Sequence, residues 1–222
     1  MRLKTIIVPD VHHNVIRLNS ILQEEADNRV FLGDWFDDFG DHPSHAVATA
    51  KRLEQLMLDP TNKFLYGNHD VHYAFPLARA TRCSGFTEEK LRALAPYAEG
   101  IRGRFRLSVE VEGWRLSHAG FHPVYIGIDP DTSLDYLMAD PTHIPVLFKA
   151  GQARGGDSKV GGCTWLDWNW EFKDTPGIKQ IVGHTPGEQV RKIGESYCLD
   201  THLRHYGVIE NGEFSWHHTR EK

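Results

Sequence analysis

The sequence predicts an α/β fold, because short apolar stretches of strand length alternate with longer stretches in which apolar residues have helical spacing. Three strands are expected at residues 5–8, 29–32 and 63–66, with a helix after each of the first two. The chain has 222 residues, 40% of them hydrophobic, which is enough apolar surface for one sizeable core. We therefore expect residues 1–222 to form a single α/β domain.

The expected helices of the first half have recognisable faces and ends. Residues 15–27 and 44–58 carry apolar residues at intervals that place them on one helical face. Another helix is expected to start after Thr87, a typical N-cap residue, and to end near Pro96. The first half thus follows the order strand, helix, strand, helix, strand, helix.

The second half is richer in strands. They are expected at residues 104–111, 114–117, 179–182, 197–199, 206–209 and 213–216. Asn211-Gly212 lies between the last two and is a strong signal for a hairpin turn. The glycine-rich stretch 151–162 is expected to be a mobile loop.

Composition excludes several classes of protein. The net charge is −5, so the basic excess typical of nucleic-acid binding is absent and nucleic acid is not an expected partner. No apolar run approaches the roughly 20 residues of a membrane helix, and no secretory signal is visible, so we expect a cytoplasmic protein. Cys83, Cys163 and Cys198 share no ligand-like spacing, which favours reduced, mostly buried thiols over disulfides or a zinc knuckle.

Metal-capable side chains follow five of the expected strands. The five segments are Asp10-Val11-His12, Gly33-Asp34 with Asp37, Gly67-Asn68-His69-Asp70, Ser117-His118-Ala119-Gly120 and Gly183-His184-Thr185-Pro186. In α/β sheets, ligands bind beyond the carboxyl ends of strands, so these segments are expected to meet. Carboxylate, amide and imidazole ligands without thiolate suit Mn, Fe, Zn or Mg ions. Glycine at positions 33, 67 and 183 keeps Cβ atoms out of a crowded centre.

This ordered set resembles the calcineurin-like metallophosphoesterase superfamily, whose motifs are D-x-H, G-D-x-x-D, G-N-H-[DE], a lone H, and G-H-x-H or G-H-T-P. The resemblance spans residues 10–186. Pro186 stands where many members have a second histidine, which points to the prokaryotic and phage serine/threonine-phosphatase-like branch. The resemblance implies a four-layer α/β/β/α sandwich of two mixed sheets flanked by helices.

The resemblance also implies a role for each motif residue. Two divalent ions are expected, with Mn²⁺ first and Fe, Zn, Ni or Co as alternatives. The first ion would be held by Asp10 and His12, the second by Asn68, His118 and His184, and Asp34 would bridge both. A hydroxide between the ions would attack phosphorus in line. His69 would protonate the leaving oxygen, Asp37 would hydrogen-bond His69, and Asn68 would also contact substrate.

Two positions depart from the family pattern. Where relatives of this branch carry phosphate-gripping arginines, in D-R-G and W-x-R, this sequence has Asp38 and Asp167. Exchanging two arginines for two aspartates shifts the charge of the pocket by roughly four units, which disfavours an ordinary protein-phosphatase site. Arg154, in the glycine-rich stretch, is the candidate replacement, with Arg79 and Arg82 behind it.

The resulting hypothesis is a metal-dependent phosphomonoesterase acting on a small phosphoester, a nucleotide or a phosphoprotein. The enzymatic alternatives are a phosphodiesterase and a dinucleoside polyphosphate hydrolase. The alternatives without catalysis are a protein-binding scaffold of the same fold and a module that holds nucleotide without cutting it. Histidines outside the motifs are expected at the surface or behind the site, namely His13, His42, His45, His72, His122, His202 and His205.

Overall fold

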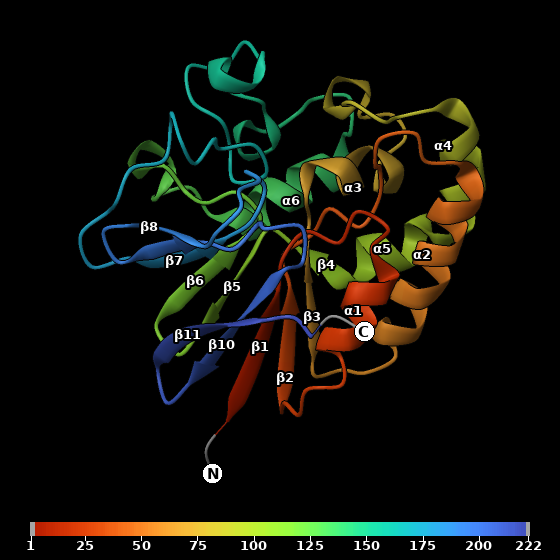
Figure 1. Cartoon of the computed structure of the whole chain (residues 1–222). Helices are drawn as coiled ribbons and strands as arrows, with labels where there is room; N and C mark the ends of the chain where they lie inside the picture. The colour runs from red at the N-terminus through yellow and green to blue at the C-terminus, as the bar shows by residue number, and fades with distance from the viewer. Residues whose placement is uncertain (1–2, 221–222) are drawn as a thin grey trace.

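The computed structural model describes residues 3–220 and contains two mixed β-sheets (Figure 1). The six-stranded sheet has the order β11-β10-β1-β2-β3-β4. Strands β1 to β4 pair in parallel, whereas β10 pairs antiparallel with both of its neighbours, β1 and β11. Its strands are β1 (Lys4–Val8), β2 (Asn28–Phe31), β3 (Asn62–Leu65), β4 (Phe105–Arg106), β10 (His205–Glu210) and β11 (Glu213–His218).

The second sheet has five strands in the order β5-β6-β7-β9-β8. They are β5 (Ser108–Val111), β6 (Trp114–Ser117), β7 (Lys179–Val182), β8 (Arg191–Ile193) and β9 (Ser196–Cys198). Strands β6, β7 and β9 are parallel, while β5 and β8 pair antiparallel with their neighbours. The parallel centres of both sheets therefore send their carboxyl ends toward the same end of the molecule (Figure 1).

Alternation along the strands divides the apolar residues among three layers. In β1, Ile6 and Val8 pack on the helical side of the six-stranded sheet, whereas Ile7 lies between the two sheets. The outer face of the second sheet has its own cluster, in which Val182 packs against Trp168 and other residues. Because both faces of each sheet are covered by apolar contacts, the central strands are almost fully buried.

Helices cover the outer face of the six-stranded sheet (Figure 1). The helices are α1 (Val15–Ile21), α2 (Pro43–Met57), α3 (Asn68–Ala74), α4 (Glu88–Leu94), α5 (Ala98–Arg104) and α6 (Pro130–Ala139). The outer face of the second sheet is covered mainly by the irregular segment 160–172, through Leu166, Trp168 and Phe172. The predicted α/β fold of two mixed sheets flanked by helices is confirmed, and much of its fourth layer is irregular chain.

Two expected elements differ in the structure. The first helix ends at Ile21 instead of residue 27, because Asp27 exchanges hydrogen bonds with the Lys4 backbone and turns the chain into β2. The expected strand 104–111 is divided at the buried Leu107, so that β4 pairs with β3 and β5 pairs with β6 in the other sheet. One expected strand thus contributes a short strand to each of the two sheets.

Two local predictions are confirmed by the structure, namely the cap of α4 and the hairpin turn between β10 and β11. The Thr87 side chain caps α4 by accepting a hydrogen bond from the Lys90 amide at 3.1 Å. Asn211 and Gly212 both have left-handed φ angles, 56° and 74°, as a two-residue type I′ hairpin turn requires. All three cysteines are free, two of them buried. Among residues 3–220, no helix has the length and apolar character needed to cross a membrane.

Candidate active site

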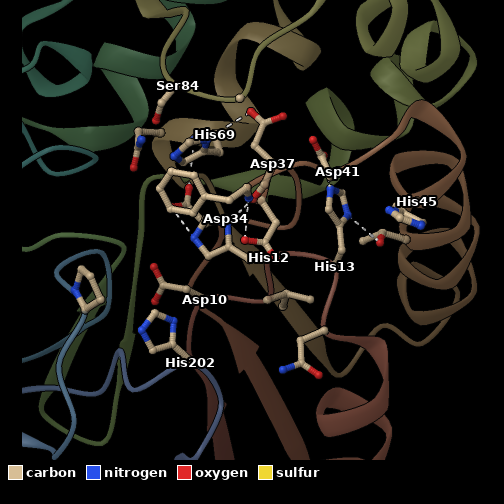
Figure 2. A pocket seen from close by; sticks show the side chains of 18 of the residues that line it. Asp10, His12, His13, Asp34, Asp37, Asp41, His45, His69, Ser84 and His202 are labelled. Atoms are coloured by element: carbon tan, nitrogen blue, oxygen red, sulfur yellow. Dashed lines mark hydrogen bonds and ion pairs between the residues drawn. The ribbon is translucent and has the colours of Figure 1, made fainter.

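The strand-end segments lie around one cavity of about 1130 Å³, and Figure 2 labels residues of the first three. The cavity is lined by residues from all but the fourth segment, together with Arg154, Trp165, Asp200 and His202. His118, from the fourth segment, is fully buried directly behind the cavity, within 3.1 Å of His184. The structure therefore brings together every predicted metal ligand.

Asp10, His12 and Asp34 form the first group of possible ligands, with one ligand atom from each lying within 4.8 Å of the others. The His12 Nδ1 atom lies 2.6 Å from the carbonyl oxygen of Asp37, so it carries the proton and donates it there. The lone pair of Nε2 is then left on the side of Asp34, whose Oδ2 atom is 3.6 Å away. A ring held by a carbonyl in this way is typical of metal-binding histidines.

Asp34, His118 and His184 form a second group with the same spacing, and Asp34 belongs to both groups. The His118 Nδ1 atom donates to the carbonyl oxygen of Leu32 at 2.9 Å, so the lone pair of its Nε2 atom faces inward. That Nε2 atom lies 3.1 Å from the Asn68 Oδ1 atom and 3.1 Å from the His184 Nδ1 atom. Lone pairs that face each other at such distances need a proton or a cation between them, so this donor set fits a metal ion.

The electrostatics of the cavity agree with this fit. Burial, reinforced by the charges of Asp200 and Asp34, raises the pKa of Asp10 to about 8. Burial opposes protonation of His12 and His118, but the Asp34 carboxylate prevails and raises the pKa of each to about 9. Side chains that hold protons this firmly without metal would exchange them for divalent cations, so metal affinity is expected to rise with pH.

The backbone at the site adopts conformations that non-glycine residues rarely take. His12, Asp34, Asp37 and His184 have positive φ angles of 39°, 48°, 64° and 68°. Each such residue costs about 1 to 3 kcal/mol and persists only where the surroundings hold it. The Asp34 carbonyl does so for His12 by accepting its amide at 2.8 Å.

Backbone amides also orient the carboxylates of the two groups of possible ligands. The His184 amide donates to Asp10 Oδ1 at 2.8 Å, and the His69 amide donates to Asp34 Oδ1 at 2.9 Å. The Oδ2 atom of Asp10 is buried and has no hydrogen-bond partner, as expected of an atom reserved for a ligand. A Cβ atom added at Gly183 would collide with the Asp10 carboxylate, which confirms the steric reason predicted for this glycine.

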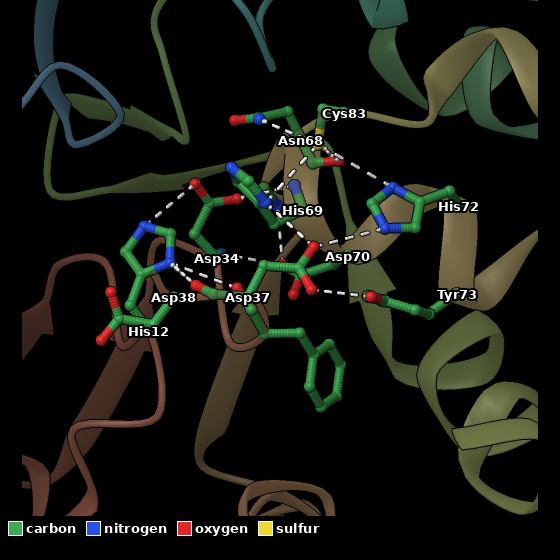
Figure 3. A network of polar contacts seen from close by, with 12 residues as sticks. His12, Asp34, Asp37, Asp38, Asn68, His69, Asp70, His72, Tyr73 and Cys83 are labelled. Carbon is green, nitrogen blue, oxygen red and sulfur yellow. Dashed lines mark hydrogen bonds and ion pairs between the residues drawn. The ribbon is translucent and has the colours of Figure 1, made fainter. Parts of the chain in front are cut away.

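His69 lines the cavity beside these groups (Figure 3). Its Nδ1 atom donates to Asp37 Oδ2 at 3.0 Å, which leaves Nε2 as the ring nitrogen available to a bound molecule. Hydrogen bonds outweigh burial and hold the pKa of Asp37 well below its usual range. Asp37 is therefore an ionised acceptor that selects the tautomer of His69.

Arg154 also reaches the cavity, as predicted, but with a partner that the sequence did not suggest. Its Nε atom lies 2.7 Å from Asp167 Oδ2, and its Nη2 atom donates to Thr185 Oγ1 at 2.9 Å. Asp38, the other aspartate at an expected arginine position, lines the cavity and is exposed. Arg82 is paired with Glu88 at 3.0 Å instead of facing the cavity.

Sequence reasoning missed the residues behind His69. Tyr73 and the buried Lys90 both donate to Asp37, and Lys90 also pairs with Asp41. The one visible signal for Lys90 is its place four residues before Leu94, on the inner face of the expected helix. Of the histidines outside the motifs, His72 is 1% exposed with its Nε2 atom 3.5 Å from Asp37 Oδ2.

The chain is similar in fold to several solved structures. A metallophosphoesterase from Sphaerobacter thermophilus has 16% identity and a TM-score of 0.47, over 99% of this chain and 89% of that one. A protein serine/threonine phosphatase from Saccharomyces cerevisiae with similarity to human phosphatase PP5 has 12% identity and a TM-score of 0.49, over 94% and 72%. Yfce, a phosphoesterase from E. coli, has 15% identity and a TM-score of 0.41, over 94% and 89%.

No curated protein sequence matches the chain. The sequence profile of the calcineurin-like phosphoesterases, in contrast, matches residues 3–208, which include both sheets apart from β11 and the last two residues of β10. That range contains every strand-end segment at the cavity. The chain belongs to the calcineurin-like phosphoesterase family.

Proposed function

We propose that this chain is a phosphomonoesterase that depends on two divalent metal ions. The observation that carries the proposal is the arrangement of two ligand groups that share Asp34, with the His69–Asp37 pair in the same cavity. A scaffold that only binds other proteins has no need of an oriented acid beside the ligands. Supporting this, His69 keeps one ring nitrogen free for a bound molecule.

In the proposed site, Asp10 and His12 would hold one ion, Asn68, His118 and His184 would hold the other, and Asp34 would contribute to both. The ions, Mn²⁺ first among the candidates, would lower the pKa of water and neutralise phosphoryl oxygens. His69, protonated on both ring nitrogens, would donate its Nε2 proton to the leaving oxygen, while Asp37 holds the Nδ1 proton in place. The Asn68 side chain would contact the substrate as well as a metal ion.

Arg154 is the proposed phosphate contact from the chain itself. Asp167 and Thr185 hold its guanidinium at the cavity. Asp167, which stands where relatives have an arginine, therefore orients Arg154 in place of supplying an arginine itself. The cavity of about 1130 Å³ far exceeds a phosphate group and leaves room for a nucleotide or peptide leaving group. The same room favours a dinucleoside polyphosphate as the second candidate substrate.

Removing Arg154 is expected to weaken substrate binding. A charge-assisted hydrogen bond contributes about 1.5 to 3 kcal/mol, so Arg154→Ala should raise KM for an aryl phosphate by roughly 10- to 150-fold. Steady-state kinetics on Arg154→Ala and on Arg82→Ala, the matched control, measure this. An unchanged KM in Arg154→Ala would remove Arg154 from the phosphate site.

The proposed function is tested by hydrolysis of p-nitrophenyl phosphate and its diester, bis(p-nitrophenyl) phosphate, with Mn²⁺ and with chelator. We expect Mn²⁺-dependent cleavage of the monoester, slower cleavage of the diester, and no cleavage with chelator. Preference for the diester would favour the phosphodiesterase alternative. Absence of cleavage of both esters and of diadenosine tetraphosphate, with metal bound, would contradict an enzymatic function.

The remaining parts of the proposal concern branch and location. We place the chain in the branch related to prokaryotic serine/threonine phosphatases, because Pro186 stands two residues after His184, where many family members have a second histidine. We propose a cytoplasmic location, supported by the three free thiols.

A further inference from the structure

Lys90 is a buried cation located behind the candidate acid. It projects from α4, and only 1% of its surface is exposed. Its Nζ atom lies 2.5 Å from Asp37 Oδ1, and 2.9 Å and 3.0 Å from the two carboxylate oxygens of Asp41. A buried lysine is rare unless it is paired, and this one is shared between two carboxylates.

The Asp37 carboxylate is surrounded by donors (Figure 3). Oδ1 accepts hydrogen bonds from Lys90 Nζ and from the Tyr73 hydroxyl, the latter at 2.6 Å. Oδ2 accepts from His69 Nδ1 at 3.0 Å and lies 3.5 Å from His72 Nε2. Since Lys90 and Tyr73 occupy one oxygen, the other is directed at the two histidine rings.

Asp41 extends the contacts of Lys90 along the wall of the cavity, which Asp41 itself lines. Its Oδ2 atom also lies 2.9 Å from His13 Nε2, and His13 Nδ1 lies 2.9 Å from Thr49 Oγ1. A continuous series of polar contacts therefore runs from α2 through His13, Asp41, Lys90 and Asp37 to His69. Figure 2 shows Asp37, Asp41 and His13 on one side of the cavity, with His69 above them.

We propose that Lys90 is a positioning residue for the leaving-group acid, which fixes the Asp37 carboxylate so that His69 presents Nε2 to the substrate. This proposal rests on the proposed function and adds to it a residue that no motif contains. Lys90 does not line the cavity, so it acts through His69 and not on the phosphoester.

The local structure of α4 makes this contact rigid. Thr87 caps the helix three residues before Lys90, and Leu94 anchors it in the core four residues after. Burial disfavours the charged amine, but hydrogen bonds to Asp37 and Asp41 raise the pKa of Lys90 above its usual value. Lys90 thus remains a cation across the pH range in which hydrolysis would be measured.

The proposal makes a prediction that a purely structural role does not. An acid matters most when the leaving oxygen is strongly basic, because a poor leaving group needs the proton before its bond to phosphorus breaks. We expect Lys90→Met to lower kcat about 10-fold for phenyl phosphate and less than about 3-fold for p-nitrophenyl phosphate, with KM and metal content unchanged. In the His69→Asn background the same change should have no further effect.

Three further variants keep the test decisive. Lys90→Gln retains a hydrogen-bond donor and should show a smaller loss of kcat with the same dependence on the leaving group. If Lys90→Met does not fold, Lys90→Gln tests the role of Lys90 in its place. Leu94→Ala lowers the melting temperature through the same helix and should leave the leaving-group dependence unchanged. Arg92→Met changes an exposed cation of α4 and should have no effect.

The outcomes separate this proposal from the proposed function. Equal losses of kcat on both esters, or a further loss in the His69→Asn background, would overturn the role of Lys90 while leaving a His69-dependent phosphatase in place. Equal activity of wild type and His69→Asn would overturn the role of His69 as the leaving-group acid. Absence of hydrolysis by wild type would overturn both proposals.

Discussion

Replacing Asp34 by asparagine should lower kcat for p-nitrophenyl phosphate by at least about a thousandfold, the largest effect expected from any single substitution in this chain. Asp34 belongs to both ligand groups and is 2% exposed, so water has no access from which to take its place as a ligand. An amide has nearly the same shape but lacks the negative charge. The loss should therefore come from metal binding and not from unfolding.

Metal analysis together with circular dichroism distinguishes these causes. We expect folded Asp34→Asn protein with reduced metal content, and the exposed Asp135→Asn, on α6, as a control with wild-type activity and metal content. A folded Asp34→Asn variant that retained full metal content and activity would contradict the sharing of Asp34 between two ions.

The second large effect is expected at His69. His69→Asn should lower kcat by about a hundredfold, the usual contribution of general acid catalysis, with little change in KM. Metal content should be unchanged, because His69 belongs to neither ligand group around Asp34. Its Nδ1 atom is bonded to Asp37 instead. The loss should grow as the leaving group becomes more basic.

Kinetics on a series of aryl phosphates, with metal analysis of the same samples, measure this effect. The matched control is the exposed His143→Asn, which should behave as wild type. Loss of a metal ion from His69→Asn would show that His69 is a ligand and not an acid, and would contradict the role assigned here.

The candidate site was more predictable from sequence than the details of the fold. Each ligand directly follows a buried strand, and parallel strands bring their carboxyl ends together, so the order of the motifs implied their meeting. The alternation of Ile6, Ile7 and Val8 between two layers has the same origin in strand geometry.

Long-range contacts explain what the sequence could not predict. Lys90 meets Asp37 across 53 residues, and Arg154 meets Asp167 from a separate turn, so neither pair produces a periodic pattern. The expected strand 104–111 alternates polar and apolar residues without a break, and its division at Leu107 depends on two separate pairing partners. Asn68 follows β3, as expected, but it is also the first residue of α3, because Asp70 caps the helix start by accepting from the Gly67 amide at 2.9 Å.

The most direct test of the central claim is the number of metal ions bound per chain. Apo protein prepared with chelator should be titrated with Mn²⁺ by calorimetry, and the loaded protein should be analysed for metal by mass spectrometry. The two ligand groups around Asp34 predict two Mn²⁺ ions per chain, with one site weakened in His12→Ala and the other in His184→Ala. Binding of a single ion, or of none, to folded wild-type protein would contradict a site of two metal ions.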